Sequence, residues 1–249
     1  MFAKHRKAYG VHSPFLYEFI SDVLYSDSYY YAFDEIYDLR ADLLSSNEVI
    51  NVTDFGAGSK IMKTSERKIR DIAKYCGISE KFGEMLYRLV MKYKPKTILE
   101  LGTSLGLGST YLAKAGKNSF ITTFEGCSET AAVAKENFSK LKLSNIHQII
   151  ADIDEKLSEY LSEINTLDFV YFDGNHQKNA TLKYFNLCKK KAVNESIFYF
   201  DDIHWSKGME EAWAQIKEDE DVRLSVDLFF SGLVFFKKEL SKQDFVVKY

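Results

Sequence analysis

The chain has 249 residues, 46% of them hydrophobic, which is enough to bury the core of one catalytic domain and leave an additional segment. Its formal net charge of -3 and its pI near 6.0 describe a mildly acidic surface. A protein that binds a phosphate backbone needs a basic face, so we expect no nucleic-acid partner. No run approaches the roughly 18 apolar residues of a membrane span, so we expect none.

The three cysteines, Cys76, Cys127 and Cys188, lie far apart and form no CxxC pair, which is typical of reduced thiols rather than of a disulfide framework. The basic run at 4–7 is followed by a stretch that polar residues interrupt, unlike the apolar core of an export signal. We therefore predict a cytoplasmic protein.

Residues 1–95 carry mainly helical patterns, at 15–25 and 81–93, with one short β-like run at 49–55. This pattern predicts an N-terminal helical cap, followed by a catalytic domain at 96–249.

Inside the predicted cap, a second glycine motif resembles a nucleotide-binding turn: Thr53-Asp54-Phe55-Gly56-Ala57-Gly58-Ser59. Lysines and a helical pattern follow it, instead of a second strand that ends in an acid. We interpret it as a loop of the cap, and a role in closing over the pocket stays open.

From residue 97 onward, short β-rich runs alternate with longer helical stretches. The predicted strands are 97–101, 119–124, 145–151, 167–172 and 196–200. The predicted helices include 128–141, 177–191 and 206–218, with Ser206 as the N-cap of the last. Two further strands at 222–229 and 232–237, joined by Phe230-Ser231, should form an antiparallel hairpin at the sheet edge. The fold predicted is α/β, with a doubly wound, mostly parallel, seven-stranded sheet of Rossmann-like type.

A glycine-rich turn from Gly102 to Gly108 follows the apolar strand 97–101 and precedes a helix. Glycines allow a ligand to approach the backbone, and the helix N-terminus offers unpaired N–H groups. The next strand ends at Glu125, where a carboxylate can accept hydrogen bonds from two ribose hydroxyls. Together these features predict a site for a cofactor that contains adenosine.

The glycine spacing also fits short-chain dehydrogenases, which leaves a nicotinamide-dependent oxidoreductase as one alternative. Those enzymes need a Tyr-x-x-x-Lys pair, and none of the 16 tyrosines here has a lysine four residues later. Glu100 favours S-adenosylmethionine, because a carboxylate offsets an ammonium and a sulfonium but would repel a pyrophosphate. A cofactor-binding module without catalysis is the second alternative.

In chain order, the motifs resemble those of class I S-adenosylmethionine-dependent methyltransferases: Glu100-x-Gly102-x-x-x-Gly106, Phe124-Glu125-Gly126, Ala151-Asp152 and the run 167–174. The resemblance covers about residues 82–238 and implies a Rossmann-like methyltransferase fold. It implies that the cofactor contacts Glu100, Gly102, Thr103, Ser104, Gly106, Glu125, Gly126, Asp152, Ile153 and Asp173. For Asp152, the N-cap of the next helix is an equally good interpretation.

Acidic residues follow the fourth and fifth predicted strands: Asp173, with His176 nearby, and then Asp201 and Asp202. Crowded carboxylates need a cation or raised pKa values. Here the chain is similar to the metal-dependent catechol and caffeoyl-CoA O-methyltransferases, which implies Mg²⁺ or another divalent cation at Asp173, Asp201 and Asp202. It departs from that pattern because Asp202 replaces the usual Asn and His176 replaces a lysine base.

The resemblance implies O-methylation of a small molecule, with His176 and Asp173 as catalytic residues. Methyl transfer from a sulfonium is an in-line displacement by a nucleophile that has lost its proton. Either His176 or a metal-bound acceptor oxygen could meet that need, and both accounts stay open. His204 is interpreted as structural. The expected partner is a small-molecule methyl acceptor, and a homodimer is one candidate for the oligomeric state.

Overall fold

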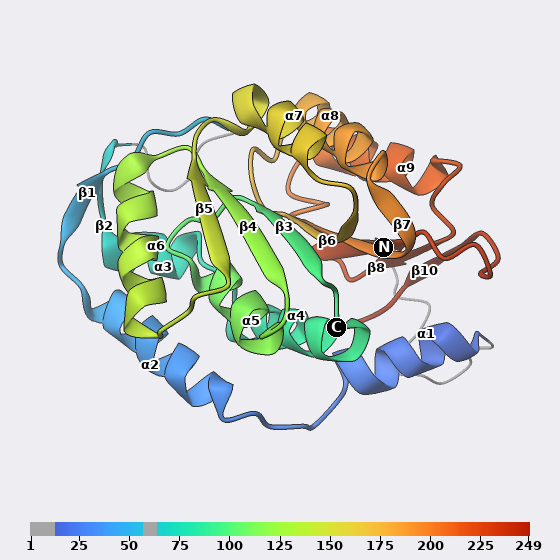
Figure 1. The fold of residues 1–249 in the computed structure, drawn as a ribbon, viewed down its shortest axis with the longest axis horizontal. Coiled ribbons are helices and arrows are strands. Elements are labelled where there is room, and N and C mark those ends of the chain that lie inside the picture. The colour runs from blue at the N-terminus through green and yellow to red at the C-terminus, as the bar shows by residue number, and fades with distance from the viewer. Residues whose placement is uncertain (1–12, 57–63) are drawn as a thin grey trace. The chain divides into compact units, whose positions relative to one another are not determined.

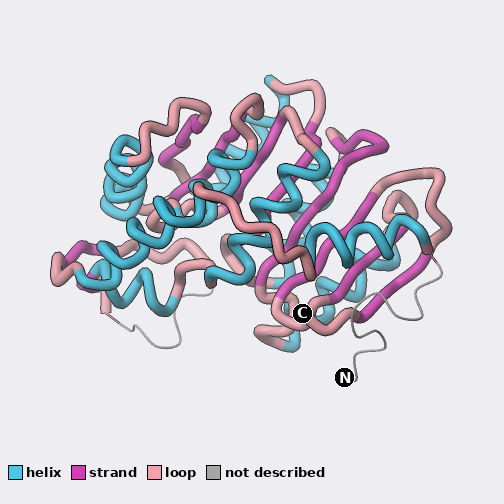
Figure 2. The backbone as a smooth tube through the Cα atoms, turned by 90° about the horizontal axis from the view of Figure 1, so that it is seen from below, coloured by secondary structure: helices cyan, strands magenta, loops and turns pink. Residues whose placement is uncertain are grey.

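The computed structural model describes residues 13–56 and 64–249. The basic run at 4–7 and residues 57–59 of the second glycine motif lie outside the described residues. Contacts group the chain into two compact units. Unit 1 contains the N-terminal segment up to residue 26, residues 97–99 and residues 156–249, and unit 2 contains 27–96 and 100–155. Figure 2 shows how helices and strands alternate along the chain.

Most of the predicted cap belongs to unit 2. Its elements are α2 (Ala32–Ser45), β1 (Val49–Asn51), β2 (Glu66–Lys68), α3 (Ile69–Tyr75) and α4 (Glu80–Tyr93). Strands β1 and β2 form a two-stranded antiparallel sheet. Helix α4 begins where the Ser79 hydroxyl accepts a hydrogen bond from the Phe82 N–H, and it ends at Lys94, which has a φ of 49°. The domain boundary predicted between 95 and 96 stays a prediction.

The rest of unit 2 is a strand and helix alternation. It contains the end of β3 (Thr97–Leu101), α5 (Leu107–Ala115), β4 (Phe120–Glu125), α6 (Ser128–Lys140), β5 (Ile146–Ile150) and the start of α7 (Ile153–Glu163). Strands β4 and β5 pair in parallel, with Glu125 opposite Ile150. Helix α6 packs beside these strands (Figure 1). Their carboxyl ends therefore lie at one edge of the sheet.

Unit 1 begins with α1 (Pro14–Phe19) and a π-helical turn, η1 (Ile20–Leu24), which together match the helix predicted at 15–25. It continues with β6 (Leu167–Phe172), α8 (Lys178–Lys189), β7 (Ala192–Asp201), α9 (Lys207–Glu218), β8 (Leu224–Asp227), β9 (Ser231–Phe235) and β10 (Gln243–Val246). The Ser206 hydroxyl accepts a hydrogen bond from the Met209 N–H at 3.2 Å, which confirms Ser206 as the N-cap of α9.

The main sheet has eight strands in the order β10-β8-β9-β7-β6-β3-β4-β5. Strand pairs β6/β7 and β4/β5 are parallel, whereas β9 is antiparallel to both β7 and β8. The mostly parallel α/β sheet and the antiparallel hairpin are confirmed. The prediction of seven strands missed β10, which pairs in parallel with β8 and is the edge strand instead of the hairpin.

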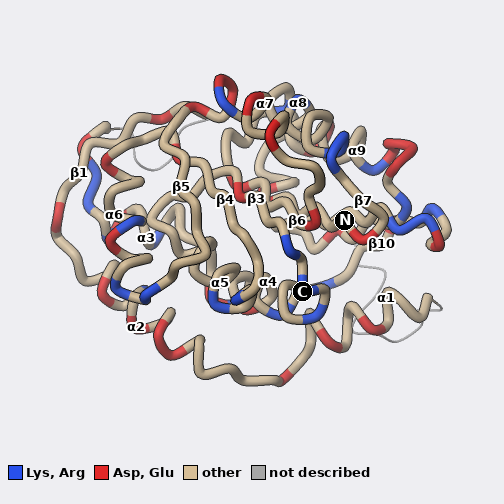
Figure 3. Tube along the Cα trace, in the orientation of Figure 1, with Lys and Arg blue, Asp and Glu red and all other residues tan. Residues whose placement is uncertain are grey.

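Charged residues of both signs are interspersed along the chain (Figure 3). Over residues 13–56 and 64–249, every helix is too short or too polar to cross a membrane.

Candidate functional site

The glycine turn of unit 2 has the backbone conformation that its sequence predicts. Gly102 and Gly106 have φ angles of 105° and 82°, a region that side chains with a Cβ rarely adopt. The N–H groups of Gly102 and Thr103 both donate to the Phe124 carbonyl, at 3.0 and 2.9 Å. A Cβ at Gly106 would lie 2.5 Å from the Phe138 ring. The turn is therefore fixed against β4 and α6, and glycine is required at Gly106 by packing as well as by φ.

Glu100 is buried beside this turn. Its Oε2 atom accepts hydrogen bonds from the Ser109 hydroxyl and, at 2.5 Å, from the Thr123 hydroxyl. Burial raises the pKa of Glu100 to about 7, although the two hydroxyls act in the opposite direction. The other oxygen, Oε1, is buried without a hydrogen-bond partner among the described residues. A buried carboxylate oxygen in that state needs a donor, and a bound cation would provide one.

Glu125 ends β4 and lies next to the same turn. Its Oε2 accepts from the Ser104 N–H at 2.8 Å, and its Oε1 accepts from the Cys127 N–H at 3.0 Å. Burial raises the pKa of the Glu125 carboxyl, and the negative charge of Asp54 acts in the same direction. Each carboxylate oxygen has a second lone pair, so the fixed carboxylate can still accept hydroxyl donors.

The remaining predicted cofactor residues of unit 2 lie at the ends of the same strands. Ser104 has a φ of 49°, and the Thr103 hydroxyl is 2.6 Å from that of Thr123. Asp152 precedes α7, which begins at Ile153, and its Oδ1 accepts from the Asp154 N–H at 2.9 Å. That bond is the capping interaction of the alternative interpretation, and a contact with adenine stays a prediction.

The acidic residues predicted at the strand ends of unit 1 come together around Asp173. Its Oδ2 accepts a hydrogen bond from the buried Tyr171 hydroxyl at 2.8 Å. The Asp173 side chain also lies within hydrogen-bonding reach of Asp201, and this contact acts to lower the pKa of Asp201. Burial and the charge of Asp202 raise the pKa of Asp201 to about 7. A carboxyl with a pKa near 7 can take up or release a proton near neutral pH.

His176 lies at the edge of this carboxyl pair, with its Nε2 atom 3.7 Å from Asp173 Oδ1. Burial lowers the pKa of His176, while the charge of Asp202 acts against that effect. An imidazole is protonated, and therefore a poor base, when the pH is below its pKa. The lowered pKa thus keeps His176 neutral over a wider pH range. The structure thus brings Asp173, Asp201 and His176 into one cluster.

The divalent ion predicted at Asp173, Asp201 and Asp202 stays a prediction. Within the described part of the chain, no three His, Cys, Asp or Glu side chains are placed to hold an ion.

His204 has a different environment. Its Nε2 atom is 3.0 Å from Asp227 Oδ2 and its Nδ1 atom is 3.2 Å from Glu210 Oε1. Asp227 is buried and also accepts from the Trp213 indole N–H at 3.2 Å. Because both ring nitrogens face carboxylates, His204 holds elements of unit 1 together, in line with its interpretation as structural.

Sequence reasoning missed several residues of these sites. Ser109 and Thr123 are hydroxyl residues within apolar stretches, and their carboxylate partner could have been inferred from that contrast. Tyr171 and Asn175 had no such signal. Asn175, with a φ of 62°, donates to the Tyr184 hydroxyl, but its Oδ1 atom is buried and has no partner among the described residues.

Comparison with known proteins gives a family for the segment that holds these residues. Residues 99–203 match a family model described as a methyltransferase domain. This segment is therefore similar to methyltransferase domains. It includes every residue that the sequence predicted for cofactor, metal or catalysis. No curated protein sequence matches the chain.

Solved structures support the same fold. The chain resembles a methyltransferase from Podospora anserina bound to S-adenosylhomocysteine, with 15% identity, a TM-score of 0.63 and coverage of 86% of this chain and 91% of that one. It also resembles an O-methyltransferase from Bacillus cereus in complex with S-adenosylhomocysteine (17%, TM-score 0.60, coverage 88% and 96%). A protein assigned as a caffeoyl-CoA O-methyltransferase from Staphylococcus aureus is similar at 14% identity (TM-score 0.55, coverage 64% and 84%). At these identities the similarity establishes the class I methyltransferase fold.

Proposed function

We propose that the protein is an S-adenosylmethionine-dependent O-methyltransferase that acts on a small molecule. The observation that carries the proposal is the pair of carboxylates at the carboxyl ends of β3 and β4. Glu100 and Glu125 are held next to a glycine turn, and Glu100 retains an oxygen for which the described residues provide no donor. Two methyltransferases of the same fold that bind S-adenosylhomocysteine, one of them an O-methyltransferase, support this assignment.

The residues of unit 2 fit the cofactor's charge. Its ammonium group would supply the donor that Glu100 Oε1 lacks, and Glu125 would accept hydrogen bonds from the ribose hydroxyls. Thr103, Ser104, Gly102 and Gly106 would line the turn, where the positive φ angles allow close approach to the backbone. When bound, the cofactor provides an electrophilic methyl group on a sulfonium.

The residues of unit 1 would remove the proton from the acceptor hydroxyl. His176 can accept that proton because its lowered pKa keeps it neutral, and the Asp173 and Asp201 pair can stabilise the resulting imidazolium. Tyr171 holds Asp173 in place through its hydroxyl. In this account the protein positions a deprotonated oxygen for in-line attack. No step requires a divalent ion, and a metal at Asp173, Asp201 and Asp202 stays a prediction that a chelator tests.

The first experiment separates the cofactor classes. Thermal-shift measurements with S-adenosylhomocysteine and with NAD should show stabilisation by the first compound alone. Stabilisation by NAD alone would instead favour the oxidoreductase.

The second experiment separates an enzyme from a binding module. The protein is incubated with S-adenosylmethionine and a panel of phenols, catechols and aliphatic alcohols, and production of S-adenosylhomocysteine is followed. Acceptor-dependent production supports the methyltransferase. Binding of the cofactor with no turnover on any acceptor would favour a non-catalytic module.

A further inference from the structure

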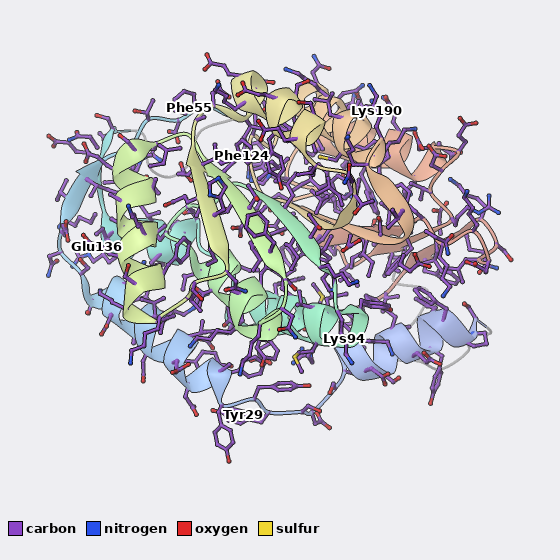
Figure 4. The ribbon with its side chains drawn as sticks, viewed as in Figure 1. Tyr29, Phe55, Lys94, Phe124, Glu136 and Lys190 are labelled. Carbon is purple, nitrogen blue, oxygen red and sulfur yellow. The ribbon has the colours of Figure 1, made fainter. Side chains whose placement is uncertain are left out.

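The second glycine motif contacts the predicted ribose site through Phe55. A Cβ built on Gly126 would lie 2.5 Å from Phe55 Cδ2 and 2.9 Å from Cε2, so the ring occupies the space that a side chain at Gly126 would fill. Gly126 directly follows Glu125. Figure 4 shows Phe55 near the same end of β4 as Phe124, the residue that precedes Glu125.

The segment that carries Phe55 is anchored within unit 2 at two residues that precede the ring, Asn51 and Asp54. The Asn51 N–H donates to Glu129 Oε2 at 2.6 Å, and the Cys127 thiol is 3.4 Å from the Asn51 carbonyl. Asp54 forms an ion pair with the buried Arg67, whose Nε donates to the Thr64 carbonyl at 2.9 Å. Strand β1 and the Arg67 contact therefore fix the position of Phe55.

Phe55 is nevertheless 48% exposed. About half of the anchored Phe55 side chain therefore faces solvent beside Glu125. An exposed aromatic face beside a carboxylate suited to ribose is complementary to a purine base attached to that ribose.

We propose that Phe55 is a cofactor-positioning residue whose ring stacks on the adenine of the bound cofactor. The inference rests on the proposed function, because it requires the ribose to bind at Glu125. Gly126 is the complementary feature: its missing side chain admits the ring from the distant segment. The negative charge of Asp54 acts on Glu125, so the segment that carries Phe55 lies beside the carboxylate proposed to bind the ribose.

The test is calorimetric titration of S-adenosylhomocysteine into the full-length protein and into Phe55→Ala and Phe55→Leu. Stacking of a base on an aromatic ring predicts that Phe55→Ala weakens binding by roughly 5- to 150-fold. Phe55→Leu keeps an apolar contact with Gly126 but lacks the flat ring, so it should recover only part of the loss. Phe55→Tyr should bind within about twofold of the original protein, because it keeps the ring.

Phe120→Ala is the matched control. Phe120 is 56% exposed and lies at the opposite end of the same strand, β4, so its removal should leave the affinity unchanged. Phe55→Trp adds a spectroscopic readout, since its added fluorescence should be quenched by S-adenosylhomocysteine, with the same midpoint as the calorimetric titration.

The outcomes distinguish this inference from the proposed function. If the original protein binds S-adenosylhomocysteine and Phe55→Ala binds equally well, Phe55 has no positioning role and the methyltransferase assignment stands. If Phe55→Ala binds more weakly, near-normal binding by Phe55→Tyr and quenching in Phe55→Trp support the stacking account. Weak binding by Phe55→Tyr, or no quenching in Phe55→Trp, overturns it. Failure of the original protein to bind the compound overturns the proposed function itself.

Discussion

The two units place their acidic residues in different chemical surroundings. In unit 2, hydrogen-bond donors surround the carboxylates: hydroxyls contact Glu100 and backbone N–H groups contact Glu125. In unit 1, Asp201 lies beside Asp173, and burial together with the charge of Asp202 raises its pKa. Hydrogen-bond donors stabilise the charged form of a carboxyl, whereas burial beside other carboxyls favours its protonated form. The comparison teaches that unit 2 is suited to binding a cation and unit 1 to moving a proton.

Burial raises one carboxyl pKa to about 7 in each unit, so burial alone does not explain the difference. Glu100 keeps an oxygen for which the chain supplies no donor within the described residues, while Asp201 has a carboxyl neighbour. The groups next to each carboxyl, rather than its degree of burial, therefore determine its chemical role.

The largest effect should come from removing the proposed base. His176→Ala should lower kcat by about 10²- to 10⁴-fold, since positioned general bases contribute that much. The affinity for S-adenosylhomocysteine should change little, because His176 belongs to unit 1. Steady-state kinetics with the best acceptor and calorimetry on the same preparation check this split.

Asp201→Asn sharpens the comparison by removing a carboxyl that titrates near pH 7, and its kcat should also fall. Glu195→Gln, an exposed carboxylate on the same strand β7, is the control and should keep full activity. Activity that disappears with a chelator and returns with magnesium would contradict the metal-free account and restore the predicted ion. Unchanged kcat in His176→Ala would show that the base is elsewhere.

The next prediction concerns stability and Glu100. Its folded pKa of about 7 exceeds the ordinary value of 4.5, so the folded state binds the proton more tightly. The free energy of unfolding should therefore fall by about 3 kcal/mol as the pH rises from 4.5 to 7. Glu100→Gln should lack this part of the fall.

Urea unfolding of both proteins at pH 5 and pH 8 measures the effect. Asp201 contributes a fall of the same sign in both proteins, so the difference between them isolates Glu100. Identical pH dependence of the unfolding free energy in the two proteins would mean that burial does not raise the pKa of Glu100.

A smaller effect is expected at the glycine turn. Gly102→Val should weaken S-adenosylhomocysteine binding by about 10- to 100-fold, because a β-branched side chain is strained at a φ of 105° and extends into the turn. Gly208→Ala is the control, since a Cβ there would make only ordinary contacts, the nearest at 3.5 Å. Binding of wild-type strength by a folded Gly102→Val protein would place the cofactor elsewhere.

The smallest effect concerns Asp152. Asp152→Ala removes the acceptor for the Asp154 N–H and should cost about 1 kcal/mol of stability, whereas Asp152→Asn keeps an acceptor and should cost a few tenths. Thermal unfolding checks both. A fall in cofactor affinity for Asp152→Asn, with stability retained, would instead favour the adenine contact that the sequence predicts.

Much of the fold could be predicted from sequence because the parallel strands are apolar runs. Strands β3 and β6 have the predicted bounds, and the glycines with positive φ are where the turn required them. Strand β10 was missed because four residues after a polar stretch carry no pattern, and its pairing with β8 depends on tertiary contact.

The site was predictable only in part. Acids at strand ends follow from parallel topology, so Glu100, Glu125 and Asp201 could be found. The hydrogen bond between Asp173 and Asp201 depends on side-chain geometry, and the contact of Phe55 with Gly126 joins segments about seventy residues apart. Sequence patterns do not encode such contacts.

Calorimetric titration of S-adenosylhomocysteine into the original protein, Glu125→Gln and Asp201→Asn tests the central claim most directly. The account predicts that Glu125→Gln binds about 10- to 100-fold more weakly, because charge-assisted hydrogen bonds to ribose are lost, and that Asp201→Asn binds within about twofold of the original. The reverse pattern, with binding retained in Glu125→Gln and lost in Asp201→Asn, would contradict the assignment of cofactor binding to unit 2 and of proton transfer to unit 1.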